Sequence, residues 1–152
     1  MMAGRLMQMW RRFRALERGD RRLVLEAVIL IGIVQGGFRV LPFATLLRVL
    51  SAAKRLRHRS HHRQSRIGWA VTAAATLVPG RTCLSDALAA DVMLCRRGYH
   101  SRLRLGVKKR NGGAEPPEAH AWVESDGTIV AGELATLSEY RTLPPRGRCN
   151  AG

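Results

Sequence analysis

The hydrophobic pattern of this chain changes its period near residue 98, and this change limits the folds open to it. Before that point apolar residues recur at helical spacing, as Leu84, Leu88 and Val92 do. From Ser101 to Val107 apolar and basic residues alternate, which is the period of a strand. Helices followed by strands favour an α+β domain in which the strands form an antiparallel sheet.

Local signals mark the expected elements. Helices are predicted over residues 6–16, 21–34, 43–56, 67–77 and 83–97. We expect Asp20 to cap the second of these helices, and we expect that helix to end before Gly36-Gly37. Strands are predicted over residues 101–107, 119–125 and 128–133, with Asp126-Gly127 as a hairpin turn.

Charge and cysteine usage bear on the surroundings of the protein. Lys and Arg total 26 against 11 Asp and Glu, and the formal charge of +15 attracts polyanions, acidic peptides or anionic lipid. The three cysteines, Cys83, Cys95 and Cys149, are a poor disulfide framework. The apolar stretch from Leu23 to Val34 is too short for a membrane span. These features predict a cytoplasmic protein and leave open only a weak contact with a membrane surface.

The histidine-rich segment between Arg55 and Arg66 does not predict a metal site. His58, His61 and His62 lie among arginines, whose charge opposes a dication, so a solvated basic segment is the better interpretation. The segment also lacks aromatic residues for base stacking. A non-enzymatic, basic nucleic-acid-binding protein is therefore ranked last among the functions considered.

Cys83 is the candidate nucleophile. Thr82 is placed as the N-cap of the helix over 83–97, so the thiol lies in the first helical turn. There the helix dipole and the free amide N–H groups stabilise a thiolate, and the amides can form part of an oxyanion hole. Cys95 lies on the apolar stripe of the same helix and is interpreted as a core residue, while Cys149 lies in a Pro-, Gly- and Arg-rich tail.

His120 is the candidate general base, and the hairpin suggests its partner. If Asp126-Gly127 form a two-residue turn, Ser125 pairs with Thr128. The same register then sets His120 opposite Glu133. A carboxylate there could accept the Nδ1–H of His120 and fix its tautomer, so Glu133 is predicted as the orienting acid. Asp126 is the rival acid and is interpreted as a turn former.

A helical cysteine, a strand histidine and a carboxylate on the next strand resemble the order found in the transglutaminase-like fold. More narrowly, several blocks resemble the leader peptidases of lasso-peptide biosynthesis. These blocks are Cys83-Leu84-Ser85-Asp86-Ala87-Leu88, Arg96-Arg97-Gly98-Tyr99, Leu105-Gly106-Val107, Ala119-His120-Ala121-Trp122-Val123-Glu124 and Tyr140-Arg141-Thr142-Leu143. One departure concerns the third member of the triad. The family usually has Asp there, whereas this chain offers Glu133, displaced by about one position.

The resemblance implies a single domain in three parts. Residues 1–66 are expected to form a helical lead-in packed on the core, residues 67–143 the catalytic core, and residues 144–152 a flexible tail.

The resemblance also implies an activity and its partners. It implies a cysteine peptidase that cleaves the leader from a ribosomally made precursor through a thioester on Cys83, without a cofactor. The N-terminal helices are unlike the family's fused recognition module, so a separate leader-recognition protein is implied, with an ATP-dependent macrocyclase acting next. A transglutaminase-type acyltransferase uses the same groups and is the alternative. The sequence leaves open the precursor, its cleavage site and the oligomeric state.

Overall fold

The computed structural model describes residues 11, 13–56, 62–109, 116–144 and 148–149. Most of the predicted helix over 6–16 lies outside this part. The helices within it are α2 (Arg18–Val40), α3 (Phe43–Arg55), α4 (Gln64–Ala75) and α5 (Cys83–Arg96). They are followed by the strands β1 (Ser101–Lys108), β2 (Glu118–Ser125), β3 (Thr128–Ala131), β4 (Arg141–Thr142) and β5 (Arg148–Cys149), with a short 3₁₀ helix at Leu137–Glu139. The prediction of an α+β fold is confirmed.

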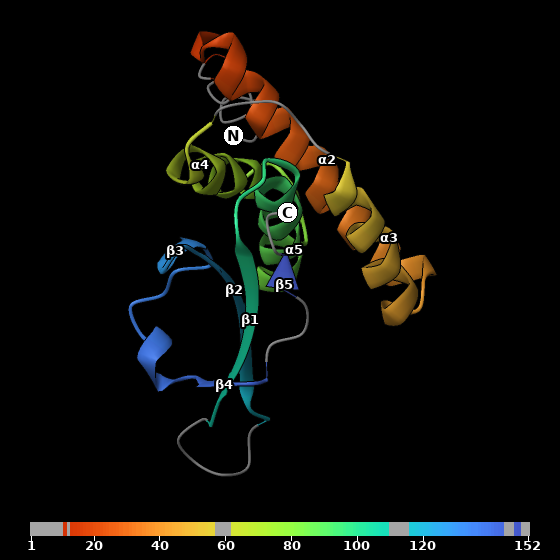
Figure 1. The fold of residues 1–152 in the computed structure, drawn as a ribbon, viewed down its shortest axis with the longest axis vertical. Coiled ribbons are helices and arrows are strands. Elements are labelled where there is room, and N and C mark those ends of the chain that lie inside the picture. Colours follow the sequence, from red (N-terminus) through yellow and green to blue (C-terminus); the bar gives the residue numbers. More distant parts are fainter. Residues whose placement is uncertain (1–10, 12, 57–61, 110–115, 145–147, 150–152) are drawn as a thin grey trace, which may run out of the picture.

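Helix α5 lies at the centre of the fold. It contacts α2, α3 and α4 as well as the sheet, and α2 and α3 lie on the side away from the sheet (Figure 1). Every residue from Ser85 to Cys95 is buried. Ala87, Ala89 and Ala90 lie in this stretch, and small side chains allow neighbouring elements to approach closely. The sequence predicts a single apolar stripe on this helix, whereas layers on both sides bury it all round.

Helix α2 extends beyond its predicted bounds at both ends. The predicted cap at Asp20 is wrong, because α2 begins at Arg18 and the Asp20 carboxylate in its first turn pairs with Arg66 of α4. The predicted end before Gly36-Gly37 is also wrong. A Cβ on Gly37 would lie 2.5 Å from Leu46 Cδ1, so this glycine allows close packing against α3 and the helix continues to Val40.

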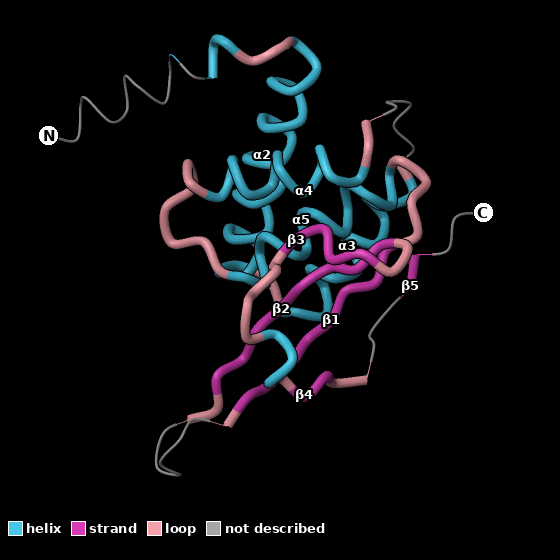
Figure 2. The backbone as a smooth tube through the Cα atoms, turned by 90° about the vertical axis from the view of Figure 1, so that its left-hand side faces the viewer, coloured by secondary structure: helices cyan, strands magenta, loops and turns pink. Residues whose placement is uncertain are grey.

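The strands form one antiparallel sheet in the order β3-β2-β1-β4, and β5 also pairs with β1. Figure 2 shows β1 and β2 extending beyond the helices, whereas β3 lies against them. The predicted hairpin is confirmed, because Ser125 pairs with Thr128. Asp126 and Gly127 between them both have positive φ, 48° and 78°, as a two-residue hairpin turn of type I′ requires.

A β-bulge follows directly after this turn. Glu124 still pairs with Ile129, but Val123 pairs with Ala131, so Val130 is an extra residue in β3. The bulge shifts each later position by one, and the pairing of the two strands ends at Ala131. The predicted register that sets His120 opposite Glu133 is therefore wrong.

Candidate active site

A cavity of about 430 Å³ lies between α4, the start of α5 and β3. Cys83, His120 and Glu133 all line it, so the fold brings the three predicted site residues to one place. Asp126 lies outside the lining, at the hairpin tip, where its carboxylate accepts a hydrogen bond of 2.5 Å from Gln64 Nε2.

Cys83 is the first residue of α5, and a capping box holds the turn in which it lies. Thr82 is the N-cap, as the sequence predicts. The Ser85 N–H donates to Thr82 Oγ1 at 3.2 Å, and the Thr82 N–H donates to Ser85 Oγ at 3.0 Å. The Cys83 thiol is free and partly exposed. The nucleophile candidate therefore sits at the positive end of the helix dipole, beside first-turn amides.

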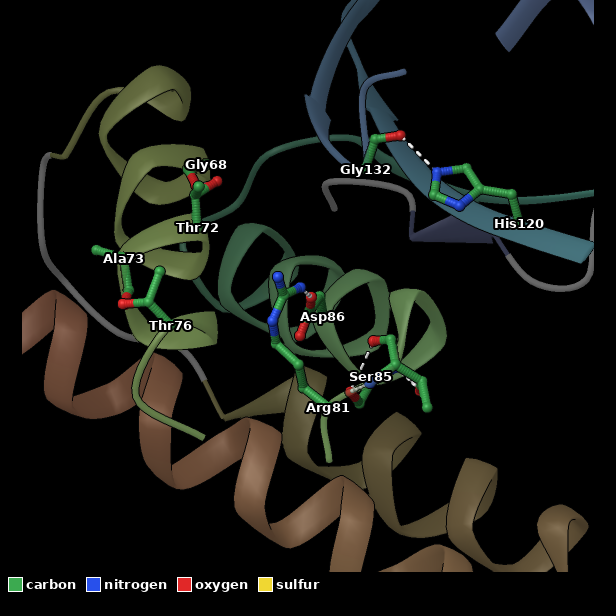
Figure 3. A network of polar contacts seen from close by, with 10 residues as sticks. Gly68, Thr72, Ala73, Thr76, Arg81, Ser85, Asp86, His120 and Gly132 are labelled. Carbon is green, nitrogen blue, oxygen red and sulfur yellow. Dashed lines mark hydrogen bonds and ion pairs between the residues drawn. The ribbon is translucent and has the colours of Figure 1, made fainter. Parts of the chain in front are cut away.

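His120 is held by a main-chain carbonyl. Its Nε2 lies 2.8 Å from the carbonyl oxygen of Gly132, as the dashed line in Figure 3 shows. A carbonyl oxygen only accepts, so Nε2 carries the proton, and Nδ1 is left as the acceptor in the neutral ring. This fixes both the tautomer and the orientation of the ring, which is the task of the third member of a triad.

Gly132 brings its carbonyl to His120 through a conformation that suits glycine. Its φ is +83°, and an added Cβ would lie 2.6 Å from the carbonyl oxygen of Ala121 and 2.9 Å from Trp122 Cα. Gly132 is not among the site residues predicted from the sequence. The available signal is a glycine that follows a short strand, because such a glycine often marks a close backbone approach.

Glu133 lines the cavity without holding the ring. It is exposed, and within the part of the chain that the structure describes no hydrogen bond joins its carboxylate to His120. The bulge explains this, since it moves Glu133 out of the cross-strand position opposite the histidine. The catalytic role of Glu133 stays a prediction.

Two buried aromatic rings flank His120. The Trp122 ring is stacked on it with centroids 6.2 Å apart, and the Tyr140 ring is tilted with centroids 5.7 Å apart. Gly106 pairs with His120 across the sheet, and a Cβ there would lie 2.9 Å from both Trp122 Cζ3 and Tyr140 Cβ. The absence of a side chain at position 106 makes room for both rings, which limit the rotamers open to His120.

The pKa of Tyr140 links this group to Cys83. That pKa is raised, first because the Tyr140 hydroxyl donates a hydrogen bond of 2.8 Å to Glu118, and then by burial and by the charge of Glu118. Lys108 acts in the opposite direction, and a negative charge on Cys83 raises the pKa further.

An acid that the sequence analysis misses also lines the cavity. Asp86 lies one turn after Cys83 on α5 and is 9% exposed. Its Oδ2 accepts a hydrogen bond of 2.6 Å from Arg81, but its Oδ1 is buried without a partner among the described residues (Figure 3). Burial raises the pKa of Asp86, while Arg81 and Ser85 act against the rise. The sequence does hold a signal for Asp86, which lies three positions after Cys83 and therefore on the same face of the helix.

Across the described residues, no group of three or more His, Cys, Asp or Glu side chains lies close enough together to hold a metal ion. His58 and His61 of the histidine-rich segment lie outside those residues.

Comparisons with known proteins place the chain in a family. A family model described as the transglutaminase-like superfamily matches residues 29–144, which include Cys83 and His120. Searches of curated proteins and of solved structures found no match. Members of this superfamily are typically enzymes, either cysteine peptidases or acyltransferases. Because the matched region is more than half of the chain, this protein belongs to the transglutaminase-like superfamily.

Proposed function

We propose that this protein is a cysteine peptidase that removes the leader from a lasso-peptide precursor, with Cys83 as nucleophile and His120 as base. The observation that carries the chemistry is the shared cavity, in which the Gly132 carbonyl holds His120 Nε2–H and leaves Nδ1 as an acceptor. The substrate class rests on the sequence blocks around Cys83, His120 and Tyr140 that resemble lasso leader peptidases.

The proposed reaction has two acyl-transfer steps. The Cys83 sulfur attacks the carbonyl carbon of the scissile bond, and the thiol proton passes to His120 Nδ1. First-turn amides of α5 donate to the oxyanion that forms. When the C–N bond breaks, His120 gives its proton to the leaving amine of the core peptide, and the leader remains as a thioester on Cys83. Water, deprotonated by His120, then releases the leader as a carboxylic acid and restores the thiol.

The Gly132 carbonyl orients His120 throughout this cycle and accepts from Nε2–H when the imidazolium forms. Glu133 remains the second candidate for this task, because it lines the same cavity and its carboxylate lies on a flexible side chain.

The proposal includes partners and a place of action. A separate leader-recognition protein presents the precursor, and the freed core amine passes to an ATP-dependent macrocyclase, as the family resemblance implies. The peptidase step itself uses no metal or organic cofactor. The cytoplasm is the proposed location, because the free thiol has to stay reduced.

Replacement of each cysteine tests the nucleophile. Precursor cleavage is followed by mass spectrometry with the recognition protein present. We expect Cys83→Ala to abolish cleavage while Cys95→Ala and Cys149→Ala retain it, with circular dichroism as the check on folding. Cleavage by Cys83→Ala contradicts the mechanism. Loss of cleavage in Cys149→Ala alone makes Cys149 the nucleophile instead.

The identity of the acyl acceptor separates a peptidase from an acyltransferase. The reaction is run with and without a primary amine, and the new end of the leader is identified by mass spectrometry. We expect the free acid in both reactions. A leader that appears only as the amide, with no cleavage when the amine is omitted, identifies an acyltransferase.

The requirement for a partner is tested with the purified chain. We expect slow cleavage by the chain alone and a large increase when the recognition protein is added. Full cleavage at a rate that the partner leaves unchanged contradicts this part of the proposal.

A further inference from the structure

The long helix α2 has one buried and one uncovered face. It is the one helix in the described part of the chain that is long and apolar enough to cross a membrane, and 39% of its most apolar stretch is buried. Its inner face carries Leu23, Ala27, Ile31 and Val34, each at most 1% exposed and part of the core. Crossing a bilayer requires this packing to be undone, so α2 is a core helix whose outer face stays open.

This outer face is apolar along most of the helix. Leu25, Ile29, Ile33 and Val40 are 53%, 52%, 51% and 78% exposed, and their spacing places them on one stripe about 22 Å long. Gly32 and Gly36 lie exposed between them, and a Cβ at either position would meet nothing within 4 Å. These six residues define the α2 outer face, and helix α2 itself lies on the side of α5 away from the sheet (Figure 1).

The exposed charged side chains within α2 and α3 have one sign, and Glu17, which directly precedes α2, is the exposed acid at its N-terminal end. The acids of α2 pair with arginines of the inner layers, Asp20 with Arg66 and Glu26 with Arg96 and Arg97. Helix α3, which also lies on this side, contains no Asp or Glu. The exposed charged residues of α2 and α3 are Arg18, Arg22, Arg39, Arg48 and Arg55. An anionic surface is therefore the electrostatic complement of this side of the molecule.

A second cavity lies at the N-terminal end of the stripe. It has a volume of about 440 Å³ and is lined by Phe13, Arg18, Arg21, Arg22 and Leu25. Arg21 Nη2 donates to the Leu16 carbonyl at 3.1 Å, but Arg21 Nε is buried without a hydrogen-bond partner among the described residues. Three guanidinium groups beside two apolar side chains match a phosphate headgroup with hydrocarbon next to it.

We propose that the α2 outer face and this arginine cavity dock the protein on a bilayer that contains anionic phospholipid. The apolar side chains enter the boundary between headgroups and acyl chains, and the arginines bind the phosphates. An amphipathic helix with basic residues beside its apolar stripe can lie in the plane of such a bilayer, with the arginines at the level of the headgroups. The inference does not depend on the peptidase chemistry.

Vesicle flotation of the full chain tests this docking. Vesicles of phosphatidylcholine alone are compared with vesicles of phosphatidylcholine and phosphatidylglycerol at about three to one. We expect binding to the anionic vesicles at least tenfold stronger than to the neutral ones, since each arginine near an anionic surface adds roughly fivefold in affinity. Added salt is expected to weaken the binding.

Variants on and away from the face give the decisive comparison. Arg18→Gln with Arg22→Gln is expected to lower affinity for the anionic vesicles about 25-fold, at roughly fivefold for each arginine. Ile29→Ser with Ile33→Ser is expected to lower it at least about tenfold. Leu143→Ser and Arg141→Gln remove the same kinds of group from the exposed end of the sheet at β4, away from α2, and are expected to change little (Figure 1). All four replacement sites on α2 are exposed, so the fold is expected to persist.

Three outcomes overturn the proposal. These are the absence of binding to anionic vesicles, equal binding to both vesicle types, and binding that the two α2 variants leave unchanged. A stable dimer in gel filtration that Ile29→Ser with Ile33→Ser dissolves, without vesicle binding, shows instead that a second copy covers the face.

Discussion

At the scale of single residues, the orienting group of this site is part of the main chain. The Gly132 carbonyl accepts a hydrogen bond from His120 Nε2–H, a task that a side-chain carboxylate performs in the Ser-His-Asp triad. A carbonyl fixes the tautomer without adding a charge, whereas a carboxylate makes a stronger, charge-assisted bond. The backbone geometry of Gly132 therefore sets the orientation of the His120 ring, and the role of its neighbour Glu133 stays a prediction.

The first prediction compares these two neighbours. Gly132→Ala is expected to lower kcat/KM for precursor cleavage about a hundredfold, because a Cβ at 2.6 Å from the Ala121 oxygen displaces the carbonyl. Glu133→Gln keeps the backbone and is expected to lose no more than about threefold. Cleavage kinetics and thermal unfolding are measured for both variants.

A spectroscopic readout separates positioning from simple destabilisation. The ¹⁵N shifts of the His120 ring report which nitrogen carries the proton, and we expect the Nε2–H tautomer in wild type and in Glu133→Gln but a mixture in Gly132→Ala. If Glu133→Gln loses the tautomer and the activity while Gly132→Ala keeps both, the carboxylate is the orienting group.

The second prediction concerns the pH dependence of stability at Asp86. Its pKa is raised above the ordinary value of 3.8, chiefly by burial. The stability that Asp86 contributes is therefore fully present below about pH 3.8 and is lost as pH rises through the raised pKa. The melting temperature of Asp86→Asn minus that of wild type is therefore expected to be larger at about pH 7 than at about pH 4.

Asp126→Asn is the matched control for this comparison. Asp126 is exposed at the hairpin turn, and Asn adopts positive φ as readily as Asp does. Its melting temperature relative to wild type is expected to be the same at both pH values. If the difference in melting temperature between Asp86→Asn and wild type does not change with pH, the effect of the substitution comes from the lost ion pair with Arg81.

At the scale of elements, a buried polar cluster joins the layers. Asp91 of α5 is 2% exposed, pairs with Lys54 of α3, and accepts a hydrogen bond of 2.5 Å from Ser101 Oγ at the start of β1. The Cys95 thiol lies 3.7 Å from the same carboxylate. The cluster ties α3 and β1 to the helix that carries Cys83.

The third prediction tests this connection. Lys54→Met leaves a buried carboxylate without its cation and is expected to lower the free energy of unfolding by about 2 kcal/mol. Lys109→Met removes the same group from an exposed position and is expected to change it by less than about 0.5 kcal/mol. Urea denaturation measures both, and equal effects show that the Asp91 pair adds nothing beyond a surface charge.

The elements were predictable where their signals are local. Thr82 as N-cap, Asp126-Gly127 as turn and the change of period near residue 98 all lie within a few positions of what they determine. The bulge has no such signal, because Val130 continues the apolar character of its strand. Its carbonyl oxygen lies 2.1 Å from where a Cβ of Gly68 would be, so contact with α4 helps fix the bulge. The misplacement of Glu133 therefore has a tertiary cause.

At the scale of the whole molecule, the net charge of +15 bears on how an acidic partner approaches the protein. Exposed charges act over about 8 Å at physiological ionic strength, so they raise the local concentration of an acidic partner more at low salt than at high salt. The cavity itself holds both signs, with Arg81 beside Asp86 and Glu133.

The fourth prediction distinguishes an electrostatic effect of the protein surface from one of the cavity. Cleavage of a precursor with an acidic leader is expected to fall about tenfold in kcat/KM between about 0.05 M and 0.5 M salt, through association rather than chemistry. A short uncharged peptide that spans the cleavage site is the control substrate, and its slower cleavage is expected to be insensitive to salt. Equal salt dependence for both substrates places the effect in the cavity.

The burial of α5 from Ser85 to Cys95 has a consequence for hydrogen exchange. Amides in a helix enclosed on every side exchange only when the whole domain opens, whereas elements with an exposed face exchange through local opening. The first turn that holds Cys83 is thus anchored to the most protected unit of the fold. The opposite wall of the cavity belongs to the short strand β3 and the exposed residues after it. Local opening of the cavity is therefore expected to begin on the side of Gly132, while the helical turn that carries Cys83 keeps its position.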